Sequence, residues 1–96
     1  MDFDTGLDDY LLFQLRRVED AHDLWCLVQR ERAAWVHHSE DDIYVVVSLR
    51  PDPDDLAVLL RSVEEWVGER GLPAVVFELD GRLYCVRAPA RVAAAA

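Results

Sequence analysis

An Asp80-Gly81 step between two apolar runs is the feature that most constrains how this chain folds. It lies within residues 75–86, which read VVFELDGRLYCV. Such a step is typical of a β-hairpin with a two-residue type I′ turn, because both central residues must adopt positive φ. The turn also fixes the register of the two strands. The predicted pairs are Leu79–Arg82, Glu78–Leu83, Phe77–Tyr84, Val76–Cys85 and Val75–Val86.

The predicted hairpin is apolar on both of its faces. One face carries Val75, Phe77, Tyr84 and Val86, and the other carries Val76, Leu83 and Cys85, interrupted by Glu78. A sheet with one face in solvent alternates between apolar and polar residues, and this hairpin does not. We therefore expect a further layer or another subunit to cover part of the second face.

The length of the chain predicts a single domain. Residues 1–96 are enough for one hydrophobic core, with 1–6 and 90–96 expected to be flexible ends. No stretch is long and apolar enough to span a membrane, and the acidic start is unlike a secretory signal, so we expect a cytoplasmic protein. Cys26 and Cys85 are far apart and imply no disulfide framework. Both lie in apolar runs and are predicted to be small buried residues.

The net charge of −9 is concentrated in the first part of the chain. Residues 1–55 hold fourteen acids against five arginines, whereas residues 56–96 hold five of each. This balance argues against binding nucleic acid or an anionic membrane, because both need basic side chains to neutralise phosphate. An acidic half is compatible with a basic protein partner, and solubility is the simpler explanation for it.

Helical spacing predicts a helix over residues 7–18. Apolar residues recur with that spacing, acids lie in the first turn, and Arg16 and Arg17 lie in the last, which suits the helix dipole. The competing interpretation is a strand over residues 10–15.

Residues 19–38 leave two interpretations open. Ala21, Leu24, Trp25, Val28 and Trp35 form a helical stripe that Glu31 and Arg32 interrupt. The segments WCLV and WVHH are instead rich in strand-forming residues, although no glycine or proline marks a turn between them. On side-chain preference we expect two strands joined near residues 30–33.

The second half of the chain is clearer. Residues 43–49 (IYVVVSL) are apolar on both faces, which predicts a central strand. Asp52 then fits the N-cap of a helix and Pro53 its first turn, while Gly71 fits the left-handed residue that ends it. The apolar side of this helix is predicted to be Leu56, Leu59, Leu60, Val63, Trp66 and Val67.

These elements predict an α+β fold with one antiparallel or mixed sheet and helices on one face, in the order α-β-β-β-α-β-β. That order, and the run VEEWVGERGLP followed by VVFELDGRLYCVRAP, resembles the type III secretion chaperone-like fold, which includes small acidic bacterial regulators. The resemblance covers about the last half of the chain and implies a homodimer that binds another protein and catalyses nothing. The alternative order, β-α-β-α-β-β, occurs in several kinds of small domain and implies no function.

His22, Cys26, His37 and His38 are the only soft-ligand set in the sequence. On a helix, His22 and Cys26 share a face, and a histidine from residues 37–38 would complete a zinc-like group if the chain folded back. No CxxC or HxxxH spacing supports this site, and adjacent histidines in a strand point to opposite faces. Surface histidines and a buried cysteine are the simpler interpretation, so we expect no cofactor and no metal.

The sequence contains no recognisable catalytic motif: its serines lack a GxSxG setting, and its glycines are too isolated to cradle a phosphate. Trp25 and Trp35 are candidate anchors for a partner protein, with core packing as the simpler interpretation, and Val76 and Leu83 are candidates on the second hairpin face. The leading hypothesis is a non-enzymatic interaction module that forms a homo-oligomer. The alternatives are an acidic inhibitor or immunity-type protein for a basic partner, and a small enzyme or ligand- or metal-binding domain that uses His22, Cys26 and His37.

Overall fold

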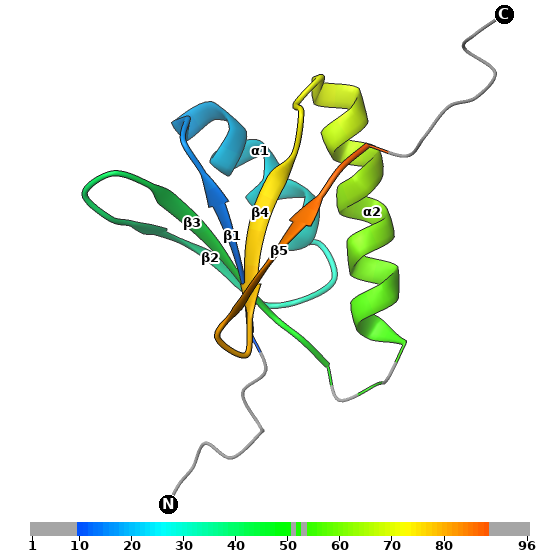
Figure 1. Ribbon diagram of the computed structural model, residues 1–96. Helices are drawn as coiled ribbons and strands as arrows, with labels where there is room; N and C mark the ends of the chain where they lie inside the picture. The colour runs from blue at the N-terminus through cyan, green and yellow to red at the C-terminus, as the bar shows by residue number, and fades with distance from the viewer. Residues whose placement is uncertain (1–9, 51, 53, 89–96) are drawn as a thin grey trace, which may run out of the picture.

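The computed structural model describes residues 10–50, 52 and 54–88. It contains one five-stranded antiparallel sheet and two helices (Figure 1). The expected α+β class is therefore confirmed, although the order of elements is β-α-β-β-α-β-β and matches neither order that the sequence suggested. The elements are β1 (Tyr10–Leu15), α1 (Val18–Val28), β2 (Ala34–His38), β3 (Ile43–Ser48), α2 (Asp55–Arg70), β4 (Val75–Leu79) and β5 (Arg82–Val86).

The first difference from the prediction is β1, because residues 10–15 form a strand and not part of a helix over 7–18. Leu11, Phe13 and Leu15 point alternately into the core, which is the period of a strand. The strand lies at the centre of the sheet, and apolar residues on its other face hide that alternation in the sequence. Arg17, expected in the last turn of a helix, instead precedes α1 as its N-cap residue.

The second difference is in residues 19–38, where a helix and one strand replace the two expected strands. Ala21, Leu24 and Val28 form the buried side of α1, as the helical stripe suggested. The interruption at residues 31–32 is the loop that follows the helix. Trp35, counted in the stripe, belongs to β2.

The second half of the chain agrees with the sequence. The Asp80-Gly81 turn has φ values of 54° and 77°, as a type I′ turn requires, and all five predicted hairpin pairs are present. Gly71, with φ 71°, ends α2 in the left-handed conformation. The prediction of Asp52 as the N-cap was wrong, because α2 begins at Asp55 with Asp54 as its N-cap residue; the Asp52 carboxylate instead accepts a hydrogen bond from the Asp54 N–H at 2.9 Å. Pro53 and the expected flexible ends lie outside the described residues.

The strand order is β2-β3-β1-β4-β5, with β1 in the centre. Both helical connections, β1-α1-β2 and β3-α2-β4, join strands that have one other strand between them. These two interlocked split β-α-β units form the ferredoxin-like arrangement, and the hairpin adds β5 at the edge. Neither helix in the described part of the chain is long and apolar enough to cross a membrane.

The core lies between the helices and one face of the sheet. Both helices cover this face, with α1 against β2 and β3 and α2 beside β5 (Figure 1). The largest fully buried side chains come from β1, β3, α1 and α2, and they are Phe13, Leu11, Leu24, Leu59, Val45, Val47, Val63 and Val67.

Candidate functional site

The most distinctive surface is the sheet face opposite the helices, which we call the open face. Strand register assigns its residues, because side chains that alternate along a strand share a face and paired residues lie side by side. One row crosses all five strands and reads Trp35, Val46, Leu12, Glu78, Leu83. The next row reads His37, Tyr44, Gln14, Val76, Cys85, and Tyr10 pairs with Ser48 beyond the first row.

The open face is largely apolar, and no element of the described residues covers it; its edge strands are exposed, whereas Val46 near its middle is buried. Trp35 is 46% exposed and Leu83 69% exposed, and these are two of the few large hydrophobic side chains in that state. Tyr10 meets Trp35 edge to face, with ring centroids 5.6 Å apart. Exposed apolar patches of this kind mark interaction surfaces in soluble proteins. The expectation that something must cover the second hairpin face therefore extends to the whole sheet.

The four predicted partner-binding residues separate into two groups. Trp35, Val76 and Leu83 lie on the open face. Trp25 packs against the core from α1, and its indole N–H donates to the carbonyl of Ala34 at 3.0 Å. Trp25 therefore helps hold α1 to β2, and Trp35 is the tryptophan available to a partner.

Several open-face residues were missed from the sequence, namely Tyr10, Leu12, Tyr44 and Val46. Two of them belong to β1, which was predicted to be helical. The sequence did contain a signal for this strand, because residues 10–15 carry apolar side chains on both faces of a strand, as residues 43–49 do.

Cys85 corrects a second expectation. Both cysteines were predicted to be buried, but Cys85 is exposed on the open face and Cys26 is half-buried. Cys85 lies on the edge strand β5, where four successive residues from Arg82 are exposed, so an apolar run there does not imply burial.

The soft-ligand set is not assembled. His22 and Cys26 do share a face of α1, with Nδ1 and Sγ 3.9 Å apart. His38 lines an apolar cavity of about 180 Å³ beside His22, whereas His37 lies on the opposite face of the sheet near Tyr44. Across the ranges that the structure describes, no three His, Cys, Asp or Glu residues are placed to hold a metal ion.

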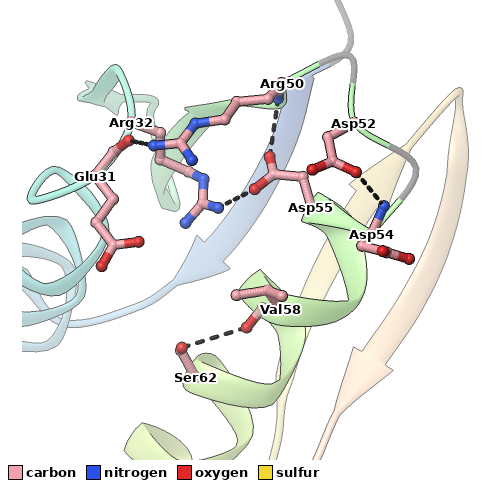
Figure 2. Close-up of polar contacts among 8 residues, drawn as sticks. All are labelled: Glu31, Arg32, Arg50, Asp52, Asp54, Asp55, Val58 and Ser62. Carbon is pink, nitrogen blue, oxygen red and sulfur yellow. Dashed lines mark hydrogen bonds and ion pairs between the residues drawn. The ribbon is translucent and has the colours of Figure 1, made fainter.

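The most buried ion pair in the described part of the chain connects separate elements of the fold. Arg32 and Asp55 form an ion pair whose side chains are only 7% and 5% exposed. Asp55 also accepts a hydrogen bond from the Arg50 N–H at 2.9 Å, and the Arg50 guanidinium donates to the carbonyl of Glu31 (Figure 2). These contacts join the loop after α1 and the end of β3 to the first turn of α2.

The environment of Asp55 keeps this carboxylate ionised. Burial alone raises its pKa, but the hydrogen bond from the Arg50 N–H and the guanidinium of Arg32 outweigh it, so the pKa of Asp55 lies below its ordinary value. A low pKa suits a permanent ion pair and not a proton-transfer group working near neutral pH.

Several acids of the N-terminal half have partners inside the protein. Asp20 and Asp23 both contact Arg70, and Asp23 also accepts the indole N–H of Trp66 at 2.8 Å. Asp42 accepts a hydrogen bond from Gln14 at 2.8 Å. Together with Asp52 and Asp55, these carboxylates stabilise the fold, so the charge asymmetry of the sequence overstates the acidic surface available to a partner.

Comparisons of this chain with protein-family models, with curated proteins and with solved structures find no match.

Proposed function

We propose that this protein is a non-enzymatic interaction module that self-associates through its open face. The single observation that supports the proposal is a five-stranded sheet with one face in the core and the other largely apolar, with Trp35 and Leu83 exposed on its edge strands. Full burial of an exposed large apolar side chain contributes about 1.5–3 kcal/mol, and Trp35 and Leu83, which are 46% and 69% exposed, would each gain the part of it that they have not yet realised.

The other function classes have less support from the geometry. Several described acidic side chains bind partners within the protein, which weakens the case for an inhibitor that docks a basic protein. The separation of His37 from His22 and Cys26 weakens the case for a metal-dependent enzyme. Both stay predictions from the sequence, as do the cytoplasmic location and the chaperone-like binding of a client protein.

Sedimentation equilibrium over a range of protein concentrations tests the proposal. We expect the wild-type protein to reach the mass of a dimer and Leu83→Glu to remain a monomer, because the new carboxylate lies in the open face. Val58→Glu is the matched control, since Val58 is 49% exposed on α2, away from that face. A wild-type protein that stays monomeric throughout, or a Leu83→Glu variant that still dimerises, would contradict the proposal.

A further inference from the structure

We infer that a second copy of this chain occupies the open face, packed sheet to sheet about a two-fold axis that runs along β1. This inference rests on the proposed self-association and adds the geometry of the dimer. Three features of the open face support it: its low charge, the uneven size of its side chains, and the central position of β1.

The charge of the open face favours a second copy over a basic partner. The chain has a net charge of −9, yet the two rows of this face contain one carboxylate, Glu78, and no arginine, and the carboxylate of Asp42 beside them is hydrogen-bonded to Gln14. A basic protein would gain little from docking there, because complementary charge is what guides such partners. A second copy presents the same surface of low charge, and most acids of both chains stay outside the interface.

The side chains of the open face are bulky on one half and small on the other. The β2–β3 half carries the large Trp35, His37 and Tyr44, and the β4–β5 half carries the smaller Val76, Leu83 and Cys85; the sizes are reversed at one pair, with the small Val46 on the first half and Glu78 on the second. Facing layers pack best when large residues on one side meet small residues on the other. The face is therefore complementary to itself if each half meets the opposite half of the second copy.

The strand order permits this arrangement. Because β1 is the central strand, a two-fold axis along it exchanges β2 with β5 and β3 with β4. Strands of the two sheets then run in nearly the same direction, as in aligned sheet packing. Following the two rows, Trp35 meets Leu83 of the second copy, Tyr44 meets Val76, and His37 meets Cys85.

Glu78 is the carboxylate within the two rows that the dimer must satisfy, since that of Asp42 already has Gln14 as a partner. The axis places it over Val46 of the second copy, whose neighbours on the open face are Trp35, on the adjacent strand, and Tyr44, two residues along β3. The indole N–H and the phenolic hydroxyl of those side chains are donors that a buried carboxylate needs.

The size of the face sets the range of concentrations to use. Five strands of five or six residues cover roughly 24 Å by 18 Å, at the small end of specific interfaces. Affinity does not follow area alone, but we expect reversible association near micromolar concentrations rather than a permanent dimer.

Disulfide trapping tests the axis on the full chain. In a Cys26→Ala parent, the substitution His37→Cys places a thiol opposite Cys85 of the second copy. Dissolved oxygen should then convert the protein to a covalent dimer on a non-reducing gel, and reduction should reverse this. Within one chain, positions 37 and 85 lie on opposite edges of the sheet, roughly 19 Å apart, which is too far for a disulfide.

Two further variants of the same parent complete the test. Leu83→Cys tests the alternative in which the two-fold axis runs across the strands. That axis would place residue 83 against Cys85 of the second copy, so this variant would then form the covalent dimer. Val58→Cys has its new thiol on α2, away from the open face, and measures how much covalent dimer forms by random collision. We expect a covalent dimer with His37→Cys and none with the Cys26→Ala parent, Leu83→Cys or Val58→Cys.

The possible failures are distinguishable. Covalent dimer already in the parent, or with Leu83→Cys and not with His37→Cys, overturns the axis, while a sedimenting dimer that Leu83→Glu dissociates still supports the proposed function. A wild-type protein that is monomeric at every concentration overturns both. In that case a segment of the same chain outside the described residues becomes the occupant to test.

Discussion

Tyr10 and Trp35 contact each other across an intervening strand. Tyr10 lies on β1 and Trp35 on β2, with β3 between them, yet their rings meet edge to face at 5.6 Å. The residue opposite Tyr10 in β3 is Ser48, whose small side chain leaves room for the contact. The pair links three strands on a face that receives no support from the helices.

We therefore expect Tyr10 and Trp35 to be energetically coupled. A double-mutant cycle with Tyr10→Ala and Trp35→Ala should give an interaction energy of about 0.5–1.5 kcal/mol, the range for aromatic pairs. Urea unfolding at low protein concentration is the measurement, so that self-association does not contribute. Additive effects of the two substitutions would mean that the rings contribute separately.

Asp55 should make the protein sensitive to acid. Its folded-state pKa lies below the ordinary value of 3.8, so its contribution is complete above that value and is lost as the pH falls through the lowered pKa. At pH 7, Asp55→Asn should cost about 3–5 kcal/mol, because it leaves Arg32 buried without its counter-ion.

Denaturant titrations at several pH values check this prediction. The difference in unfolding free energy between wild type and Asp55→Asn should shrink below about pH 4, as the wild-type carboxyl becomes protonated. Asp54→Asn is the control, since Asp54 is exposed and its side chain makes no capping hydrogen bond to α2. A difference that stays constant down to low pH would show that the ionised form of Asp55 does not stabilise the fold.

Two neighbouring residues of α2 should respond very differently to truncation. Leu59 is 1% exposed and Val58 49% exposed. Leu59→Ala should lower the free energy of unfolding by about 2–5 kcal/mol, through lost burial and the cavity that it leaves. Val58→Ala should change it by no more than about 0.5 kcal/mol. Thermal unfolding followed by circular dichroism is the measurement. Similar losses of stability in the two variants would indicate that α2 does not pack against the sheet.

The hairpin turn should depend on Gly81 through backbone conformation alone. A Cβ at this position would meet no atom within 4 Å, but φ is +77°, which disfavours any other residue. Gly81→Ala should cost about 1–2 kcal/mol. Asp80→Asn should be neutral, because asparagine tolerates positive φ as well as aspartate does. Equal melting temperatures for Gly81→Ala and wild type would indicate a different turn.

The parts of the fold that the sequence predicted have local causes. Asp80 and Gly81 determine a turn by themselves, and that turn determines every pair of the β4–β5 hairpin. Gly71 ends α2 for a similarly local reason. The class of the fold followed from these elements and from the apolar pattern of β3.

The parts that the sequence did not predict depend on tertiary context. Residues 10–15 are apolar on both faces, so their periodicity does not separate a central strand from a helix. Trp25 has the side chain of a strand former, yet it lies in α1, where packing against β2 overrides propensity. The open face could be assigned only once the register placed Trp35, Leu12 and Leu83 in one row.

The central position of β1 also governs the order in which the sheet can be completed during synthesis. Within this sheet Phe13 belongs to the strand that is synthesised first, and one of its two neighbours, Phe77, lies in a strand that is synthesised much later. Until β4 emerges, β1 has a free edge, and free edges recruit other strands. A chain that stops before β4 is therefore expected to aggregate rather than to fold in part.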